Sequence, residues 1–181
     1  MNLAKTSIPD VQIIEPVLFA DHRGFFMESW RDEWSSQIGN DIHFVQDNHS
    51  KSAQGTLRGL HYQIKHAQGK FVRVIQGKIY DAVVDMRKAS KTFGQWEGVV
   101  LSEDNRRSLW IPPGFAHGFY VISEIAEIIY KCTDYYTPEH ERCLLWNDPE
   151  VGIKWPLHNS EVLISDKDAT GLAFAQSEYY P

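Results

Sequence analysis

The run Thr56-Leu57-Arg58-Gly59-Leu60-His61-Tyr62-Gln63 decides how this chain folds, because residues 57–63 alternate in the manner of a β-strand. Successive side chains of a strand point to opposite faces of its sheet, so every second residue shares one face. The residues predicted to share a face are Leu57, Gly59, His61 and Gln63. This prediction aims His61 at the same interior as the apolar side chains.

A lysine follows closely, in Gly69-Lys70-Phe71-Val72-Arg73-Val74, and we expect Lys70 to enter the same cavity from the neighbouring strand. Histidine removes a proton near neutral pH, and a nearby lysine stabilises the oxyanion that proton loss leaves behind. A hydrogen-bonded histidine of the core and a lysine that protects an edge strand fit the same residues. The stretch by itself leaves both interpretations open.

From His43 onward the sequence indicates β-structure almost throughout. Short segments rich in Val, Ile, Phe, Tyr and Trp are separated by turn residues, which is typical of a sandwich or a barrel. A short helix is predicted over residues 31–38, closed by a C-cap at Gly39-Asn40. The predicted strands span residues 25–29, 71–76, 79–85, 96–101, 108–111, 119–122, 126–132 and 143–146.

These features predict one mainly β domain over residues 1–181. We expect a double-sheet jelly roll with short helices, an N-terminal extension at about residues 1–28 and a loose C-terminal tail at about residues 169–181. Hydrophobic residues make up 43% of the chain and charged residues 23%, which is the composition of an ordinary globular protein with a core of its own.

The formal net charge of -6 gives the chain no general attraction for nucleic acid or for an anionic membrane. An anionic ligand therefore needs a local basic pocket. The first residues lack the apolar core of a signal peptide, and no stretch reaches transmembrane length. Cys132 and Cys143 do not form the cysteine framework of a small secreted protein. We expect a cytoplasmic protein that binds neither nucleic acid nor membrane.

The spacing of Pro112-Pro113-Gly114-Phe115-Ala116-His117 resembles the second motif of the cupin jelly rolls, and the His61 stretch stands where their first motif belongs. Metal-binding cupins carry a second histidine where this chain has Gln63, and a carboxylate where it has residues 67–69. Two imidazoles alone make a poor metal site. We therefore predict no metal, no cofactor, and acid–base chemistry in the cavity.

Several motifs together carry a resemblance to one enzyme family. In order along the chain they are Gln46-Asp47-Asn48-His49-Ser50, residues 57–63, 69–73 and 111–119, Tyr130-Lys131-Cys132-Thr133-Asp134-Tyr135-Tyr136, Asn147-Asp148-Pro149 and Ile153-Lys154-Trp155-Pro156. This set resembles the dTDP-4-dehydrorhamnose 3,5-epimerases over about residues 13–168. The resemblance implies a metal-free cupin-type double-stranded β-helix, a homodimer, and a nucleotide-linked 4-keto-6-deoxy sugar as substrate, whose product feeds L-rhamnose biosynthesis.

The resemblance also implies four catalytic residues. His61 is implied to be the base, with Asp168 orienting its imidazole, and Tyr130 the acid. Lys70 is implied to stabilise the C4 oxygen of the sugar. Such a set suits the chemistry, because the C4 ketone acidifies the hydrogens at C3 and C5 and inversion requires reprotonation from the opposite face. At neutral pH a phenol with a pKa of about 10 donates a proton and an imidazole with a pKa of about 6.5 accepts one.

The positions that bind substrate are carried over in the same way. Arg23 and Arg58 match positions that hold the diphosphate, to which the guanidinium fork is well shaped. The other matches are Glu28, Gln46, Asn48 and His117 for the sugar, Tyr136 for stacking on thymine, and Glu141 and Lys167 on the nucleotide side. In the family the N-terminal extension of the partner subunit makes several of these contacts. Residues 169–172 depart from the family pattern, which leaves the path of the tail open.

Two other functions remain open from the sequence. Relatives with the same catalytic residues invert only C3 or only C5, and the shape of the pocket decides between them. A non-catalytic nucleotide-sugar binding cupin belongs to a different class, because a fold does not fix a function. The complete set of base, acid and lysine favours the 3,5-epimerase, since a binding protein has little use for both a base and an acid.

Overall fold

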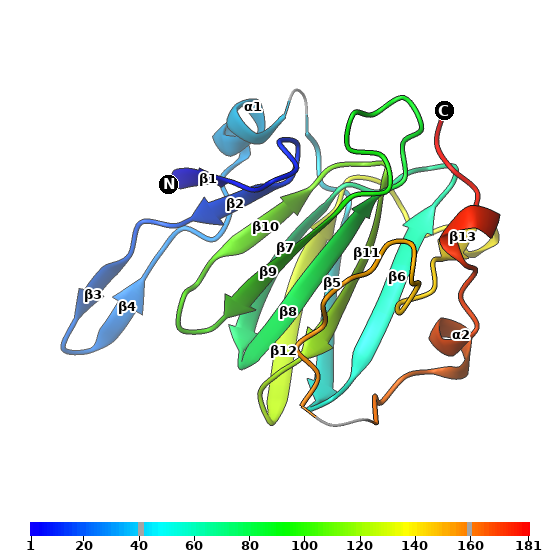
Figure 1. Ribbon diagram of the computed structural model, residues 1–181. Helices are drawn as coiled ribbons and strands as arrows, with labels where there is room; N and C mark the ends of the chain where they lie inside the picture. The colour runs from blue at the N-terminus through cyan, green and yellow to red at the C-terminus, as the bar shows by residue number, and fades with distance from the viewer. Residues whose placement is uncertain (40–41, 159–160) are drawn as a thin grey trace.

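Two antiparallel β-sheets face each other in the computed structural model, which describes residues 1–39, 42–158 and 161–181 (Figure 1). The larger sheet has the strand order β1-β2-β10-β7-β12-β5, and the smaller sheet has the order β13-β6-β11-β8-β9. The strands of the larger sheet are β1 (Asn2–Lys5), β2 (Gln12–Glu15), β5 (Gln46–Ala53), β7 (Lys70–Gln76), β10 (Ser108–Ile111) and β12 (Ile125–Cys132). Those of the smaller sheet are β6 (Leu57–Gln63), β8 (Lys78–Asp85), β9 (Trp96–Ser102), β11 (Phe115–Val121) and β13 (Glu141–Cys143). The mainly β, double-sheet architecture predicted from the sequence is confirmed.

The helical segments are short. The helix predicted over residues 31–38 is a 3-10 turn, η1 (Asp32–Trp34), followed by one α-helical turn, α1 (Ser35–Ile38). Gly39 caps this turn as predicted, with an extended backbone (φ 170°) and its N–H donating to the Ser35 carbonyl over 3.0 Å; Asn40 lies outside the described residues. The remaining helices are η2 (Pro138–His140), α2 (Asp166–Ala169) and η3 (Phe174–Gln176). No described helix has the length and apolar character of a transmembrane span.

Two strand predictions within the two sheets need correction. Strand β11 begins at Phe115, earlier than the predicted residue 119. The prediction missed its first residues because all of β11 is buried, and a fully buried strand lacks the alternation that marks a half-exposed strand. Strand β13 ends at Cys143, where we predicted the start of a strand over 143–146. Leu144 still exchanges backbone hydrogen bonds with Leu60 of β6, and the chain turns away after it, where the Leu145 N–H donates to the Leu172 carbonyl.

Apolar side chains fill most of the space between the sheets and cover their outer faces. The core between the sheets includes Val72, Val83 and Ile128. The outer face of the larger sheet packs against Trp34 and its neighbours around α1. The C-terminal segment covers the outer face of the smaller sheet, with Phe174 buried in a second cluster. The prediction of a loose tail is therefore wrong for these residues.

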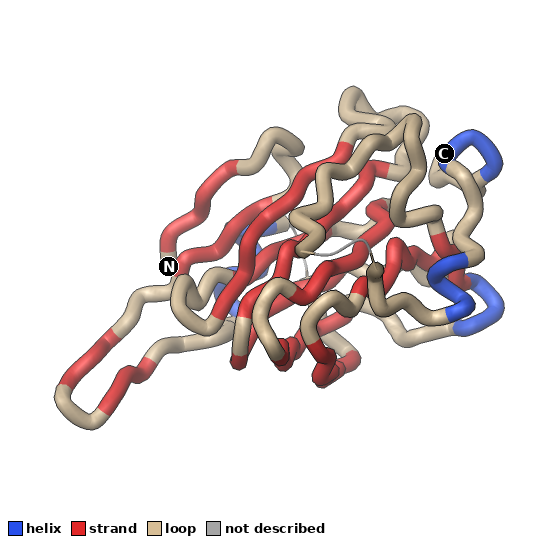
Figure 2. Tube along the Cα trace, turned by 60° about the horizontal axis from the view of Figure 1, so that its bottom comes forward, coloured by secondary structure: helices blue, strands red, loops and turns tan. Residues whose placement is uncertain are grey.

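A β-hairpin projects away from the two sheets. It consists of β3 (Phe19–Asp21) and β4 (Gly24–Phe26), and both views show it extending beyond the body of the molecule (Figures 1 and 2). The predicted strand over residues 25–29 is observed only at its start, because β4 ends at Phe26. Three of the hairpin's aromatic side chains are exposed, and Phe26 is 66% exposed. The hairpin thus carries an apolar surface that its own chain leaves uncovered.

Candidate active site

Strand β6 aims two functional side chains at the interior because it contains a bulge. His61 lies opposite His117 of β11, and Arg58 lies opposite Phe119, so two residues of β6 but only one of β11 separate the pairs. An extra residue of this kind shifts the alternation of a strand by one position. Arg58 and His61 therefore both face the interior, although an unbroken strand would point them to opposite sides.

The bulge decides which of the face predictions hold. The prediction is wrong for Leu57, which the bulge places on the face opposite to that of His61. It is confirmed for Gln63, which lines a cavity together with His61. Gly59 lies in the bulge, where an added Cβ would come within 2.6 Å of Gly118 Cα. Glycine at this position therefore permits the close approach of β11 that the bulge requires.

Asp168 meets His61 inside the protein although it lies far along the chain. His61 Nε2 is 2.7 Å from Asp168 Oδ1, and the Gly59 N–H donates to Asp168 Oδ2 over 3.1 Å. Helix α2 presents the carboxylate, and the Ser165 hydroxyl that caps this helix accepts from the Asp168 N–H. Burial by itself raises the pKa of Asp168, but the hydrogen bond and charge of His61 and the Gly59 N–H hold it below its usual value. Asp168 is thus a carboxylate at neutral pH.

Lys70 and Tyr130 reach the same place from the opposite sheet. Lys70 is on β7 and Tyr130 on β12, both in the larger sheet, whereas His61 is on β6 in the smaller one. The prediction that Lys70 enters the cavity is confirmed, but not from a neighbouring strand, because β6 and β7 lie in facing sheets. The three side chains together line two cavities, one on each side of them.

These cavities gather most of the predicted substrate-binding residues. The first, of about 240 Å³, is rich in amide and phenol groups, and the second, of about 340 Å³, holds the Arg58 guanidinium. Among the predicted residues, the first cavity is lined by Gln46, Asn48, Tyr136 and Glu141, and the second by Arg58, His117, Lys167 and Asp168. His61, Lys70 and Tyr130 form the waist between them, so a ligand that passes from one cavity to the other passes the reactive groups.

The mouth of the site carries a cluster of three predicted residues. Lys167 forms an ion pair with Glu141, and the Tyr136 hydroxyl donates to the same carboxylate over 2.9 Å. Burial by itself raises the pKa of Glu141, but the hydrogen bonds from Lys167 and Tyr136 hold it below its usual value. This cluster joins β13 to α2, and therefore joins the mouth of the site to the segment that delivers Asp168.

Sequence analysis missed a second buried carboxylate. Asp81 of β8 is fully buried, and both of its oxygens lie 2.9 Å from His117 Nε2. Asp81 stands in the run Asp81-Ala82-Val83-Val84, where nothing local links it to His117. Only the pairing of β8 with β11 brings the two together.

Two predicted residues do not lie at this site in their own chain. Arg23 is at the turn of the β3–β4 hairpin, where its side chain is 79% exposed and paired with Asp21. Glu28 follows the hairpin and lies 3.5 Å from Arg31. Neither of them is among the described residues that line the two cavities.

Cys143 adds a third metal-ligand type beside the histidine and carboxylate. The ligand atoms of His61, Cys143 and Asp168 lie within 4.8 Å of one another. Burial, reinforced by Asp168, raises the pKa of Cys143 to about 12, and metals bind the thiolate rather than the thiol. His61 Nε2 and Asp168 already satisfy each other, so these residues favour proton transfer, and the expectation of no metal stays a prediction.

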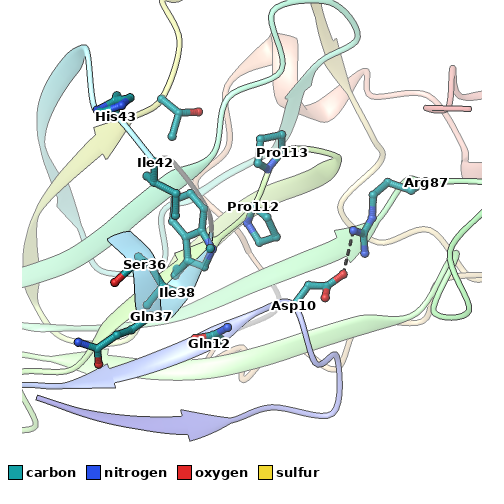
Figure 3. A pocket seen from close by; sticks show the side chains of 13 residues that line it. Asp10, Gln12, Ser36, Gln37, Ile38, Ile42, His43, Arg87, Pro112 and Pro113 are labelled. Carbon is teal, nitrogen blue, oxygen red and sulfur yellow. Dashed lines mark ion pairs between the residues drawn. The ribbon is translucent and has the colours of Figure 1, made fainter. Parts of the chain in front are cut away.

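A larger hollow of about 790 Å³ lies at a different place, between α1 and the loop that holds Pro112 and Pro113 (Figure 3). The charged groups that Figure 3 joins by a dashed line, Asp10 and Arg87, lie 2.9 Å apart and form an ion pair. This hollow is lined by none of the three side chains at the waist of the two cavities. Its size alone therefore does not make it the reaction site.

Comparison with known proteins agrees with this geometry. The family profile described as dTDP-4-dehydrorhamnose 3,5-epimerase matches residues 5–176. The chain belongs to this family. As a dTDP-4-dehydrorhamnose 3,5-epimerase family member it is an isomerase, and the cupin-type jelly roll expected from the resemblance is the fold of its structural neighbours.

Individual relatives show how similar the family members are. A dTDP-4-dehydrorhamnose 3,5-epimerase of Pseudomonas aeruginosa is 54% identical over 182 residues, with 100% of both chains covered. A crystal structure of the enzyme from Legionella pneumophila in complex with dTDP-4-keto-L-rhamnose has a TM-score of 0.95 and 48% identity, covering 98% of this chain and 94% of that one. A 3'-monoepimerase of Streptomyces bikiniensis in complex with dTDP-quinovose has a TM-score of 0.88 and 34% identity, covering 94% and 87%.

The electrostatics of the waist suit the epimerase family. Burial lowers the pKa of Lys70, against the opposing influence of Cys132, Asp81 and Glu141. Burial also raises the pKa of Tyr130 above its usual value of 10.0. Tyr130 is therefore a phenol at neutral pH and available to donate a proton. The scarcity of water around Lys70 strengthens the attraction between its ammonium form and a nearby developing negative charge.

Proposed function

We propose that His61, Lys70, Tyr130 and Asp168 catalyse the conversion of dTDP-4-dehydro-6-deoxy-D-glucose to dTDP-4-dehydro-L-rhamnose. The observation that carries this proposal is the meeting of a hydrogen-bonded His–Asp pair from one sheet with a lysine and a phenol from the other. Inversion of a carbon centre requires a base and an acid on opposite sides of one cavity, so this meeting supports the proposal.

His61 acts as the base through its Nδ1 atom. A carboxylate only accepts hydrogen bonds, so the proton between His61 and Asp168 belongs to His61 Nε2. The lone pair on Nδ1 is then free to remove the acidic proton next to the C4 ketone. Asp168 fixes this tautomer and stabilises the imidazolium that forms.

Lys70 stabilises the intermediate. Removing a proton from C3 or C5 moves negative charge onto the C4 oxygen, and an ammonium group near this oxygen is worth most where water is excluded. The Lys70 side chain enters the waist from β7, next to the inward-facing Val72 of the same strand. The apolar neighbourhood makes the cation costly when the site is empty and effective when the enolate forms.

Tyr130 returns the proton from the opposite face. His61 and Tyr130 belong to facing sheets and line the same two cavities, so a sugar ring between them presents one face to each. Removal by His61 and delivery by Tyr130 then invert the carbon. Repeating the sequence at the second carbon gives the 3,5-epimer.

Arg58 and Lys167 supply the positive charge for the diphosphate in an otherwise acidic protein. Both line the second cavity, and the Arg58 side chain is oriented by a 3.0 Å hydrogen bond to the Ser52 hydroxyl. Tyr136 lies 48% exposed at the mouth, where its ring is available for stacking on a base. Gln46, Asn48 and His117 then remain to contact the sugar.

The alternative of a single-site epimerase is less well supported. The 3'-monoepimerase relative shares the fold but is 34% identical, whereas the 3,5-epimerase of Pseudomonas aeruginosa is 54% identical. A binding protein without activity would have no need to keep the His61–Asp168 pair and the Tyr130 phenol in one cavity. We therefore favour inversion at both carbons.

Replacing Tyr130 by phenylalanine tests the two-face mechanism. In Tyr130→Phe we expect proton removal to continue while reprotonation from the tyrosine side fails. Incubated with dTDP-4-dehydro-6-deoxy-D-glucose in heavy water, the variant should still incorporate deuterium next to the ketone, with the rate of inversion at one or both centres reduced by about 10²–10⁴. NMR of the sugar locates the label and the stereochemistry together.

The matched control is Tyr120→Phe, which removes a buried phenol whose hydroxyl accepts from the His158 N–H, outside the two cavities. It should leave both inversions intact. Wild-type rate and product stereochemistry in Tyr130→Phe would remove Tyr130 from the mechanism. Label at only one carbon in the wild-type protein would make the chain a single-site epimerase.

We further propose that the protein is a homodimer in which the β3–β4 hairpin completes the partner's site. The hairpin leaves large apolar side chains uncovered, including Phe19 at 61% exposure, and exposed aromatic patches mark interaction surfaces. Arg23 at its tip and Glu28 at its base are the two predicted binding residues that lie away from the cavities of their own chain. In a dimer, Arg23 and Glu28 of one chain can reach a cavity of the other chain while the hairpin and the cavity keep their conformations.

Mixing two defective variants tests this shared site. Arg23→Ala and His61→Ala should each be poorly active alone. In a mixed dimer, one cavity combines the intact His61 of one chain with the intact Arg23 of the other, so activity should return to roughly a quarter of the wild-type sites after random exchange of subunits. If the mixture stays as inactive as its components, Arg23 does not act across a dimer.

Two predictions complete the proposal. We infer a cytoplasmic protein, because Cys132 and Cys143 are both free rather than joined in a disulfide. We also infer that residues 1–181 act as one domain, since the N-terminal strands β1 and β2 extend the larger sheet and the tail covers the smaller one.

A further inference from the structure

Three side chains of different ligand types converge beside the catalytic pair. The ligand atoms of His61, Cys143 and Asp168 lie within 4.8 Å of one another, and no other group of three such ligands comes as close in the part of the chain that the structure describes. A tetrahedral metal ion bound by nitrogen, oxygen and sulfur holds these atoms about 3.3–3.5 Å apart. The cluster is therefore close to the size of a metal site, and binding requires only small movements of the side chains.

Three separate elements hold these ligands in place. Cys143 of β13 pairs directly with His61 of β6, and the side chains of directly paired residues lie on the same face of a sheet. Asp168 comes from α2, where hydrogen bonds with His61 and the Gly59 N–H hold its carboxylate. A ligand set that is already assembled loses little conformational freedom when it binds an ion.

The second cavity gives a cation access to the cluster. His61 and Asp168 both line this cavity of about 340 Å³, and the partly buried Cys143 thiol lies next to them. The cation thus uses the same cavity that we assign to the substrate, and it meets the imidazole and the carboxylate there.

The donor set selects the kind of cation. Imidazole nitrogen, thiolate sulfur and carboxylate oxygen together suit Zn²⁺ or the softer Cd²⁺, whereas Mg²⁺ and Ca²⁺ prefer oxygen alone. Burial raises the pKa of Cys143 to about 12, so Cys143 is a thiol before binding. An ion that coordinates a thiol displaces its proton, which passes to solvent. The thiolate and the Asp168 carboxylate then balance the charge of a divalent cation.

We propose that His61, Cys143 and Asp168 form an inhibitory site for a thiophilic divalent cation such as Zn²⁺ or Cd²⁺. The cation binds His61 Nε2, which releases its proton to solvent while Nδ1 takes a proton from solvent. Nδ1 then has no lone pair with which to remove a proton from the sugar, so the cation blocks the reaction and is not a cofactor. Binding follows from the cluster itself, whereas inhibition rests on the function proposed for His61.

Titration of the protein with CdCl₂, in a buffer free of chelators and added thiols, tests the site. Cd²⁺ bound to a thiolate absorbs in the ultraviolet, so binding is measured independently of activity. We expect this absorption to saturate at one Cd²⁺ per chain. Conversion of dTDP-4-dehydro-6-deoxy-D-glucose should fall in parallel and return when EDTA is added. MgCl₂ at the same concentrations should have neither effect.

Cys143→Ala removes the ligand that is specific to this site. Loss of a residue that merely supports a ligand weakens metal binding by about 10–100-fold. Loss of the thiolate itself should therefore raise the Cd²⁺ concentration for half-inhibition at least about tenfold, and it should abolish the absorption. Turnover without Cd²⁺ should stay normal, because Cys143 takes no part in the proton transfers. Cys143→Ser is a second variant if the alanine variant folds poorly.

Cys132→Ala is the matched control, because it removes the other free cysteine, which is buried on β12. It should keep both the absorption and the sensitivity to Cd²⁺, when its rate with Cd²⁺ is compared with its own rate without it. His61→Ala should weaken the binding of Cd²⁺ without abolishing the thiolate absorption, since the other two ligands remain.

The outcomes distinguish the cation site from the proposed function. Equal inhibition of the wild-type protein and Cys143→Ala overturns the site, as does a thiolate absorption that persists in Cys143→Ala. An unchanged midpoint of the Cd²⁺ titration in His61→Ala overturns it too. If Cd²⁺ binds through Cys143 and His61 while turnover continues, the cation site is supported and His61 is instead removed as the base.

Discussion

His61→Ala should reduce turnover by about 10²–10⁴, the range that a positioned general base contributes, while binding of dTDP changes by only a few-fold. The loss follows from the geometry, because His61 is held by Asp168 at 2.7 Å at the waist of the two cavities. Solvent deuterium should no longer enter at C3 or C5, since the same base serves both carbons. Calorimetric titration with dTDP and NMR of the sugar measure the two effects separately.

His49→Ala is the matched control for the loss of a histidine. His49 lies on the outer face of β5, where its side chain is 56% exposed and contacts Glu127, and we expect normal turnover. Asp168→Ala should also reduce turnover, because without this carboxylate the imidazole of His61 is no longer held in one tautomer. Near-normal turnover of His61→Ala would show that another group removes the proton.

The sequence predicted the double-sheet fold well, because this fold depends on local patterns. Short β-branched and aromatic runs separated by turns are enough to predict a double-sheet β-domain. Strand β6 was predicted with its observed bounds, and His61 was predicted to face inward. The predicted face was wrong for Leu57, which precedes His61 in the strand. The bulge that changes it depends on how β11 approaches Gly59 and not on the alternation within β6.

The features that local sequence patterns did not reveal depend on contacts between distant segments of the chain. Asp168 lies near the end of the chain and reads as a solvated residue, yet bridges Thr56 to Leu163 and Leu144 to Leu172 guide this segment back to β6. The resemblance supplied Asp168 where local physics did not. Asp81 was missed because a single aspartate in an apolar strand shows neither its partner nor its complete burial.

Lys70→Met should reduce kcat by about 10²–10³, the loss typical for removal of one group that stabilises an oxyanion. Methionine nearly matches the lysine stem in volume, so the cavity should keep its shape while losing the charge. The control is Lys131→Met on β12, whose ammonium pairs with Asp47 on the outer face of the sheet, and which should retain wild-type kcat. Unchanged kcat in Lys70→Met would mean that the C4 oxygen is stabilised by another group.

The same substitution should raise the stability of the folded protein. Burial lowers the pKa of Lys70 from its value of 10.5, so the unfolded chain holds this proton more tightly than the folded one. The resulting penalty is fully present below the folded pKa of Lys70 and is relieved as pH rises from that value to the unfolded value of 10.5. At pH 7 methionine removes it, and each kcal/mol gained should raise Tm by about 2–4 °C in a domain of this size. A lower Tm in Lys70→Met would mean that the fold, as well as the reaction, depends on this cation. A gain in Tm with a loss of kcat would instead identify Lys70 as a group kept for catalysis against the stability of the fold.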